Sequence, residues 1–347
     1  MNRRDFLKTS IIGGLLTPSF SFAKTTNRHH FIMPPKPFEF VVKEGKRKGG
    51  RILIIGGIHG NEPGGYKSSD LLIDSEIEKG TLAILARSNP ESIFTFKRGY
   101  NGDMNRKFAS LSKKDADFYK VNSIKNFIAE FKPDVILSLH DGYGYYAKHH
   151  NQWGECLVID EAQYKHINLL SKASFVSNFL RKKGFNIPIH NTRTSEKNSH
   201  HKEQRMSLTY YALTQHHIPA FCIEGSKQNS IERNLKIHLL AIEQFFNLYN
   251  VKISPSFNYL ISQIDKLIKP KPTKIVAYIN NHKKIISHSQ IIKVPKNSEI
   301  KFEILNNRAG GLLAKNVNVN YHSFFYRNSL SFIVKNDNLS EYSFKII

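Results

Sequence analysis

Residues 51–62 read Arg-Ile-Leu-Ile-Ile-Gly-Gly-Ile-His-Gly-Asn-Glu. The apolar run at 52–55 is continuous rather than alternating, which is typical of a strand buried on both faces of a parallel or mixed sheet. The glycine-rich segment that follows places His59 and Glu62 three residues apart, just beyond the end of this predicted strand. Ligands of open α/β sheets bind at this edge. The two side chains are therefore candidates to share one ion, although a lone His-x-x-Glu is more often incidental.

Similar apolar runs alternate with helical patterns along most of the chain. Strands are predicted at 38–42, 51–55, 81–86, 134–139, 157–159 and 220–223, and helices at 66–73, 120–131, 167–181, 203–214 and 231–249. The alternation predicts an α/β fold with a mixed, largely parallel sheet flanked by helices.

The character of the sequence changes after residue 268. Lys269-Pro270-Lys271-Pro272 is a proline-punctuated linker. Beyond it, alternating segments at 274–279, 290–294, 299–304 and 331–334, with turns at 280–281 and 295–297, predict short strands. We therefore expect a main α/β domain at 24–268 and a small antiparallel β-sandwich or barrel at 269–347.

Residues 1–23 have the pattern of an export signal. A basic start with Arg3 and Arg4 precedes a short apolar stretch that ends in small residues near Ala23. The paired arginines resemble the twin-arginine signal of proteins exported already folded, with an ordinary secretory signal or chance as the alternative. The apolar stretch is too short to anchor a membrane. We expect a periplasmic protein with no integral membrane span in the mature chain.

The composition excludes several classes of protein. With 40% hydrophobic and 23% charged residues, the chain is neither disordered throughout nor fibrous. The net charge of +23 favours polyanionic surroundings. Export argues against nucleic acid as a partner, and codon bias towards Lys, Asn and Ile explains the charge equally well. Only Cys156 and Cys222 are present, so a disulfide scaffold is excluded, while a single pairing between them stays open.

Two more predicted strands end in chemically capable side chains. His140 follows the strand at 134–139, and two imidazoles with one carboxylate and an open fourth position form a catalytic zinc arrangement. Glu224 closes the apolar run at 219–223, where desolvation should raise its pKa towards the range useful for proton transfer. Taken singly, a hydrogen-bonded histidine and a sheet-edge salt bridge explain these residues as well.

A segment between these strands carries Arg98 and, a few residues on, Asp103-Met104-Asn105-Arg106. Arginine binds a carboxylate through two parallel hydrogen bonds, and a neighbouring asparagine adds a directional one. Loop arginines are usually solvated, so the pattern has little weight alone.

Taken together, these residues resemble the carboxypeptidase A-like zinc metallocarboxypeptidases. The resemblance covers about residues 38–249 and rests on the order of four matches: His59-x-x-Glu62, Asp103-x-Asn105-Arg106, His140 and Glu224. The resemblance implies that His59, Glu62 and His140 bind one Zn²⁺ per chain and that Asp103 orients His59. It implies that Asn105 and Arg106 grip the substrate's terminal carboxylate. It also implies that Arg98 polarises the scissile carbonyl and that Glu224 is the general base.

The resemblance leaves the family's active-site tyrosine unmatched, and it is greatest to one subgroup of the family. Digestive members use a mobile active-site tyrosine. Tyr210 and Tyr211 lie in the corresponding region, but the role is not carried over to either of them. Given the export signal and the β-domain, the chain is similar to the cell-shape-determining DL-carboxypeptidases of helical bacteria. These remove meso-diaminopimelate from peptidoglycan stem peptides, which makes such peptides the expected partners. They often carry two β-modules, and only one fits here.

The same residues allow other interpretations. A deacylase of the succinylglutamate desuccinylase/aspartoacylase type uses the same constellation on N-acyl amino acids, and a non-catalytic wall-binding protein would lack a ligand or the base. Nucleic-acid binding has only composition behind it. The histidine pairs at 149–150, 200–201 and 216–217 are expected near the surface rather than in a second metal site.

Overall fold

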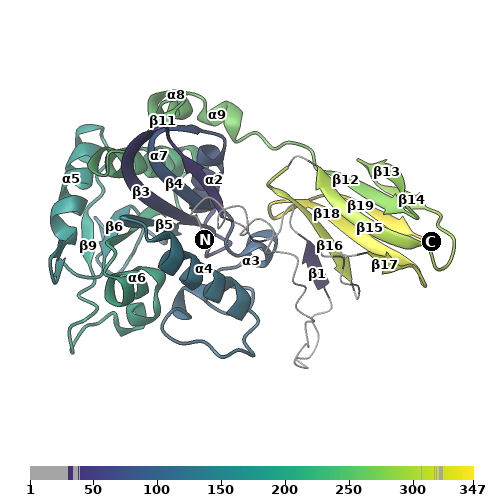
Figure 1. The fold of residues 1–347 in the computed structure, drawn as a ribbon, viewed down its shortest axis with the longest axis horizontal. Helices are drawn as coiled ribbons and strands as arrows, with labels where there is room; N and C mark the ends of the chain where they lie inside the picture. The colour runs from purple at the N-terminus through teal and green to yellow at the C-terminus, as the bar shows by residue number, and fades with distance from the viewer. Residues whose placement is uncertain are drawn as a thin grey trace. The chain divides into compact units, whose positions relative to one another are not determined.

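The computed structural model describes residues 30–33, 38, 40–305, 307–315, 317, 319 and 323–347. The predicted signal at 1–23 lies outside these residues. The chain divides into two compact units (Figure 1), one of residues 40–269 and one that joins 270–347 to the described residues before Phe40. Within the described part, no helix is long and apolar enough to cross a membrane.

The larger unit is built on an eight-stranded sheet with the order β11-β4-β3-β5-β10-β6-β9, in which β2 also pairs with β4. The strands are β2 (Val41–Glu44), β3 (Arg47–Gly56), β4 (Glu76–Leu85), β5 (Val135–Gly142), β6 (Cys156–Ile159), β9 (Ile189–Asn191), β10 (Ala220–Ser226) and β11 (Lys252–Ser254). The central pairs β3–β4, β3–β5 and β5–β10 are parallel, whereas β6 runs antiparallel to β10. This confirms the predicted mixed, largely parallel sheet.

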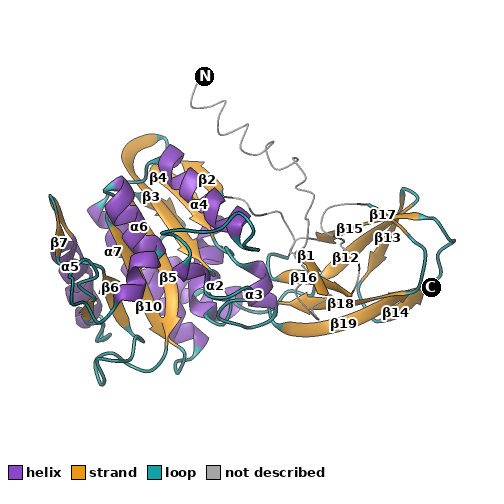
Figure 2. Ribbon diagram, turned by 90° about the horizontal axis from the view of Figure 1, so that it is seen from below, coloured by secondary structure: helices purple, strands orange, loops and turns teal. Residues whose placement is uncertain are grey.

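Helices cover both faces of this sheet (Figures 1 and 2). They are α2 (Pro63–Ile73), α3 (Pro90–Phe94), α4 (Phe118–Phe131), α5 (Leu169–Lys182), α6 (Leu208–His216), α7 (Ile231–Leu248), α8 (Phe257–Ser262) and α9 (Ile264–Leu267), with the short turns η2 (Met104–Arg106) and η3 (Lys202–Met206) and the hairpin β7 (Gln163–Tyr164) and β8 (Ile167–Asn168). Ile52, Leu53, Ile54 and Ile55 are all fully buried. Because successive strand residues point to opposite faces, β3 is covered on both sides, as its continuous apolar run predicts.

The helix predicted at 203–214 is divided in two. Ser207 has an extended backbone and separates η3 from α6. Its Oγ accepts a hydrogen bond from the backbone N–H of Tyr210 at 3.2 Å, which caps α6. Hydrophobic periodicity alone does not detect such a cap, so the sequence predicts one continuous helix.

The smaller unit consists of two sheets with the orders β1-β16-β18-β19-β14 and β13-β12-β15-β17. Its strands are β1 (His30–Met33), β12 (Lys274–Ile279), β13 (His282–Ile286), β14 (Gln290–Ile292), β15 (Glu299–Leu305), β16 (Gly310–Lys315), β17 (Phe324–Phe325), β18 (Leu330–Asn336) and β19 (Leu339–Ile346). The two sheets share one core, in which the ring centroids of Phe302 in one sheet and Phe332 in the other are 5.0 Å apart. The unit is a β-sandwich whose pairs are antiparallel except β14–β19.

One segment lies elsewhere than predicted. The sequence places residues 24–268 in a single domain, but β1 pairs antiparallel with β16 and so belongs to the β-sandwich unit. A strand whose partner lies so far along the chain leaves no local signal of where it pairs.

Candidate metal centre

The loop after β3 presents His59 and Glu62 at the carboxyl end of the sheet. Gly57 has a φ of 71°, a conformation that glycine adopts without strain. A Cβ at Gly60 would lie 1.9 Å from the carbonyl carbon of Ser92, so only glycine fits there. Glu62 then immediately precedes α2. The glycines therefore let the chain fold tightly enough for both side chains to turn to one point.

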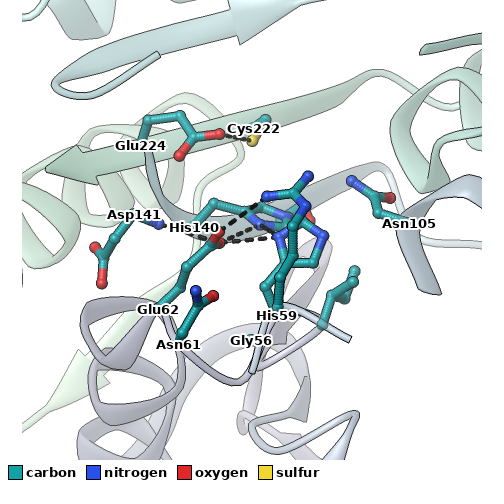
Figure 3. A network of polar contacts seen from close by, with 12 residues as sticks. Gly56, His59, Asn61, Glu62, Asn105, His140, Asp141, Cys222 and Glu224 are labelled. Carbon is teal, nitrogen blue, oxygen red and sulfur yellow. Dashed lines mark hydrogen bonds and ion pairs between the residues drawn. The ribbon is translucent and has the colours of Figure 1, made fainter. Parts of the chain in front are cut away.

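Three atoms meet at this point. The Nδ1 of His59 lies 3.0 Å from the Oε2 of Glu62, the Nδ1 of His140 lies 2.8 Å from the same oxygen, and the two Nδ1 atoms are 3.1 Å apart. All three side chains are buried. Figure 3 shows them converging from the loop and from β5. Among the residues that the structure describes, this is the one group of three that could hold a metal ion.

The chemistry of these atoms fits a cation. The Nε2 of His59 lies 2.9 Å from Asp103 Oδ1. An ionised carboxylate only accepts hydrogen bonds, so Nε2 donates and Nδ1 of the neutral ring carries a lone pair. This lone pair faces the carboxylate of Glu62, and two acceptors in contact repel unless a proton or a metal ion lies between them. The carboxylate–histidine pair is also the arrangement that orients a metal-binding imidazole.

Positive side chains surround the Glu62 carboxylate. Arg98 Nη1 lies 3.3 Å and Lys227 Nζ 3.2 Å from Glu62 Oε1, while Arg98 Nε donates to Asp103 Oδ2 at 3.0 Å. When a proton rather than a metal ion lies between the rings and Glu62, burial opposes ionisation of Glu62, but the charge of protonated His59 and hydrogen bonds from both histidines outweigh burial and hold the pKa of Glu62 well below the usual range. Glu62 is thus a charged candidate ligand in a buried site.

The sheet register brings Glu224 beside the metal-binding group. In the parallel pair β5–β10, Glu224 is the register partner of His140, so their side chains share one face. Its Oε1 accepts a hydrogen bond from Cys222 Sγ at 3.2 Å (Figure 3), and its Oε2 is buried without a partner. Burial, and then the charge of Glu62, raise the pKa of Glu224 well above the usual range. A carboxylate in this position is suited to taking up a proton.

The Asn105–Arg106 pair is tied to the same site through Asp103. Asp103 caps the short turn η2 by accepting from the backbone N–H of Asn105 at 2.9 Å. The side-chain oxygen of Asn105 accepts from the backbone N–H of Leu208 at 3.0 Å, which joins η2 to the start of α6. Arg106 Nη1 donates to the carbonyl of Asn105 at 3.1 Å and its side chain is partly exposed. Asp103 thus connects His59 to the short turn η2, which carries Arg106.

The structure also adds residues that sequence reasoning missed. Ser138 Oγ lies 2.9 Å from His140 Nε2. Asp141 accepts from the backbone of Gly64 at 2.6 Å and lies 3.2 Å from His238 Nε2, so it fixes the end of β5 to α2 and α7. The spacing Ser138-x-His140 was a usable signal, because alternate residues of a strand share a face. No local feature of the sequence indicates that Lys227 reaches Glu62.

The remaining candidates lie outside this cluster. Cys156 and Cys222 are free thiols, not a disulfide. The hydroxyl of Tyr210 contacts Ser195 at 3.3 Å, and that of Tyr211 contacts His216 Nε2 at 3.1 Å. No contact of either tyrosine hydroxyl with the metal-binding group occurs in the described part of the chain. The active-site tyrosine role therefore stays without a residue.

Comparison with known proteins gives the family of the larger unit. Residues 29–269 match the model of a family described as the catalytic part of a carboxypeptidase controlling helical cell shape. Among curated proteins, carboxypeptidase 2 of Trichophyton rubrum is 31% identical over 103 residues, which cover 26% of this chain and only 18% of that protein's length.

Solved structures are similar over more of the chain. A variant of the cell shape determinant protein Csd4 from Helicobacter pylori matches with a TM-score of 0.68 and 26% identity, over 89% of this chain and 76% of the other. The form of Csd4 bound to mDAP, described as a D,L-carboxypeptidase, matches with a TM-score of 0.59 and 19% identity, over 88% of this chain and 99% of the other. At that identity the second match shows a shared fold.

Proposed function

Because the chain belongs to the family of carboxypeptidases that control helical cell shape, we propose that it is a zinc-dependent exopeptidase acting on peptidoglycan stem peptides. The proposed leaving residue is meso-diaminopimelate, which the similar fold of Csd4 binds. The observation that carries the proposal is the convergence of two histidines and one glutamate, with Glu224 in register beside them. This arrangement has every group that peptide hydrolysis needs.

His59, Glu62 and His140 are the proposed ligands of a single zinc ion. Tetrahedral zinc with ligands at about 2.0–2.1 Å places the ligand atoms about 3.3 Å apart, close to the 2.8–3.1 Å between these donors. Zinc in such a site supplies a nucleophile at neutral pH and polarises the scissile carbonyl. Three protein ligands are the number found in catalytic rather than structural zinc sites.

The chain's own residues then bind the substrate and move the proton. Arg106 and Asn105 hold the terminal carboxylate, which restricts the reaction to the last peptide bond. Glu224 takes the proton of the attacking water at its unpartnered Oε2 and delivers it to the leaving amine. Arg98, half-exposed and beside Glu62, donates to the carbonyl oxygen as negative charge develops there.

The direct test is digestion of purified muropeptides followed by mass spectrometry. We expect loss of one terminal diaminopimelate from tripeptide stems and no internal cleavage. Muropeptides that all remain unchanged, together with hydrolysis of N-acyl amino acids, would instead favour the deacylase. The non-catalytic alternative requires a missing ligand or base, and all four residues are present.

Arg106→Ala tests the carboxylate grip. We expect KM to rise and kcat/KM to fall by about 30-fold or more, because a charge partner of the substrate is removed. Arg106→Lys, which keeps the charge but not the planar fork, should recover part of the loss. The measurement compares inhibition by a peptide with a free C-terminus and by its C-terminal amide. A variant that still favours the free acid as strongly as the unmodified enzyme would contradict this role.

We also propose that residues 1–23 direct export to the periplasm through the twin-arginine route. The support is the pair Arg3–Arg4 in its basic and apolar context. Replacing both by lysine keeps the charge but removes the motif. We expect the double variant to stay in the cytoplasm in cell fractionation. Unchanged export would favour an ordinary secretory signal, which reads charge and hydrophobicity only.

A further inference from the structure

The face of β10 that carries Glu224 is partly open to solvent at Cys222. Cys222 lies on the same face, two residues earlier, and donates to Glu224. It is partly exposed even though β10 is flanked by β5 on one side and β6 on the other. A central-strand residue reaches solvent only where the layer above the sheet leaves an opening. The layer over this face of β10 is therefore open beside the proposed general base.

Asp160 is a buried carboxylate on the same side of the sheet as Cys222. Val158 lies opposite Cys222 in the antiparallel pair β6–β10, and Asp160, two residues further along, continues the same face. It directly follows β6, the neighbour of β10, and is only 3% exposed. Its Oδ1 accepts a hydrogen bond from Thr194 Oγ1 at 3.0 Å, and Thr209 on α6 also hydrogen-bonds its carboxyl group. Thr209 follows Leu208, whose backbone N–H is bound by Asn105. Asp160 is thus joined through α6 to the residues proposed to hold the substrate's terminal carboxylate.

The surroundings of Asp160 lack a paired cation. Within the described residues, no lysine or arginine lies at ion-pair distance from its carboxylate, and its recorded side-chain hydrogen bonds are from threonine hydroxyls. Burial raises the pKa of Asp160 to about 6, against which the threonine hydrogen bonds and the charge of Arg106 act. Buried carboxylates in proteins are normally paired. A neutral acceptor would be enough to bind the two threonine hydroxyls, so the charge of Asp160 is not explained by these hydrogen bonds.

We propose that Asp160 forms the floor of the pocket for the side chain of the leaving residue and binds an ammonium group on that side chain. This inference rests on the proposed function, because it places the substrate by its terminal carboxylate at Arg106. A residue held there whose side chain bears an ammonium group several bonds from its α-carbon would bring to Asp160 the cation it lacks. The resulting charge-assisted hydrogen bond selects such residues over neutral ones of the same length.

The test compares two stem tripeptides that differ in one group. One ends in meso-diaminopimelate, the other in 2-aminopimelate, which has the same carbon chain and distal carboxylate but no side-chain amine. We expect the unmodified enzyme to favour the first by about 30-fold or more in kcat/KM. Asp160→Asn keeps the size and the acceptor for Thr194, so the preference should fall to near unity while cleavage of the amine-free peptide is largely retained.

A matched control is Glu161→Gln. Glu161 is the next residue and accepts from the backbone of Ser195, beside Thr194. Its replacement removes one charge from the same segment, and the preference should persist. Equal loss of both activities in Asp160→Asn would show a structural role and overturn the proposal. An unmodified enzyme that cleaves both peptides equally would overturn it without any variant.

Failure of the proposed function gives a different result. If the unmodified enzyme cleaves neither peptide, calorimetry with free meso-diaminopimelate and free 2-aminopimelate decides the question of Asp160 by itself. Tighter binding of the amine-bearing compound that disappears in Asp160→Asn would support the ammonium pocket. Equal binding of both compounds would overturn it.

Discussion

Glu224→Gln is expected to lower kcat by about 10³-fold, within the range that general-base catalysis supplies, while one metal ion per chain is retained. Glutamine keeps the size of the side chain and can still accept from Cys222 Sγ through its amide oxygen. What it loses is the ability to take up a proton at the position of Oε2. The metal-binding residues belong to other segments, so their geometry should survive.

The measurement is peptide hydrolysis together with elemental analysis and a thermal unfolding curve. Cys222→Ser serves as the control, because it keeps a hydrogen-bond donor to Glu224 and should keep most activity. Near-normal turnover in Glu224→Gln would remove Glu224 as the base. Loss of metal together with activity would show instead that Glu224 supports the metal centre.

His59→Ala is expected to abolish metal binding and activity together. Two ligands would remain, and the carboxylate of Asp103 would lose the imidazole that it orients. Because a metal ion that binds only the folded state stabilises it, a chelator should lower the melting temperature of the unmodified protein. The same chelator should leave the melting temperature of His59→Ala unchanged.

The control here is His200→Ala, which removes an exposed histidine. It should retain one zinc ion per chain by elemental analysis and respond to the chelator as the unmodified protein does. Stoichiometric zinc in His59→Ala would contradict the proposed ligand set.

Features with local causes could be predicted from the sequence. The continuous apolar run ending at Ile55 indicates a strand buried on both faces, and the glycines after it indicate a tight loop bearing His59 and Glu62. The turn at Asn280 and Asn281 follows from two residues that tolerate positive φ, and both adopt it. Such features depend on neighbours in sequence.

Features set by distant pairing could not be predicted in this way. That Glu224 lies level with His140 depends on the register between β5 and β10, which are separated by β6 and the segments around it. Lys227 reaches Glu62 only through the same arrangement. Asp160 is an unremarkable acid after a short strand until α6 and Thr194 enclose it.

The pairing of β1 with β16 has a consequence for biosynthesis. Residues 40–269 contain all the described strands of their own sheet, so none of these strands has to wait for the C-terminal residues to be made. The β-sandwich, in contrast, combines a strand that precedes the larger unit with strands that follow it. Its edge at β16 is completed only when the newly made C-terminal strands meet a segment synthesised long before. Any nascent chain stopped before residue 310 therefore carries β1 without its partner.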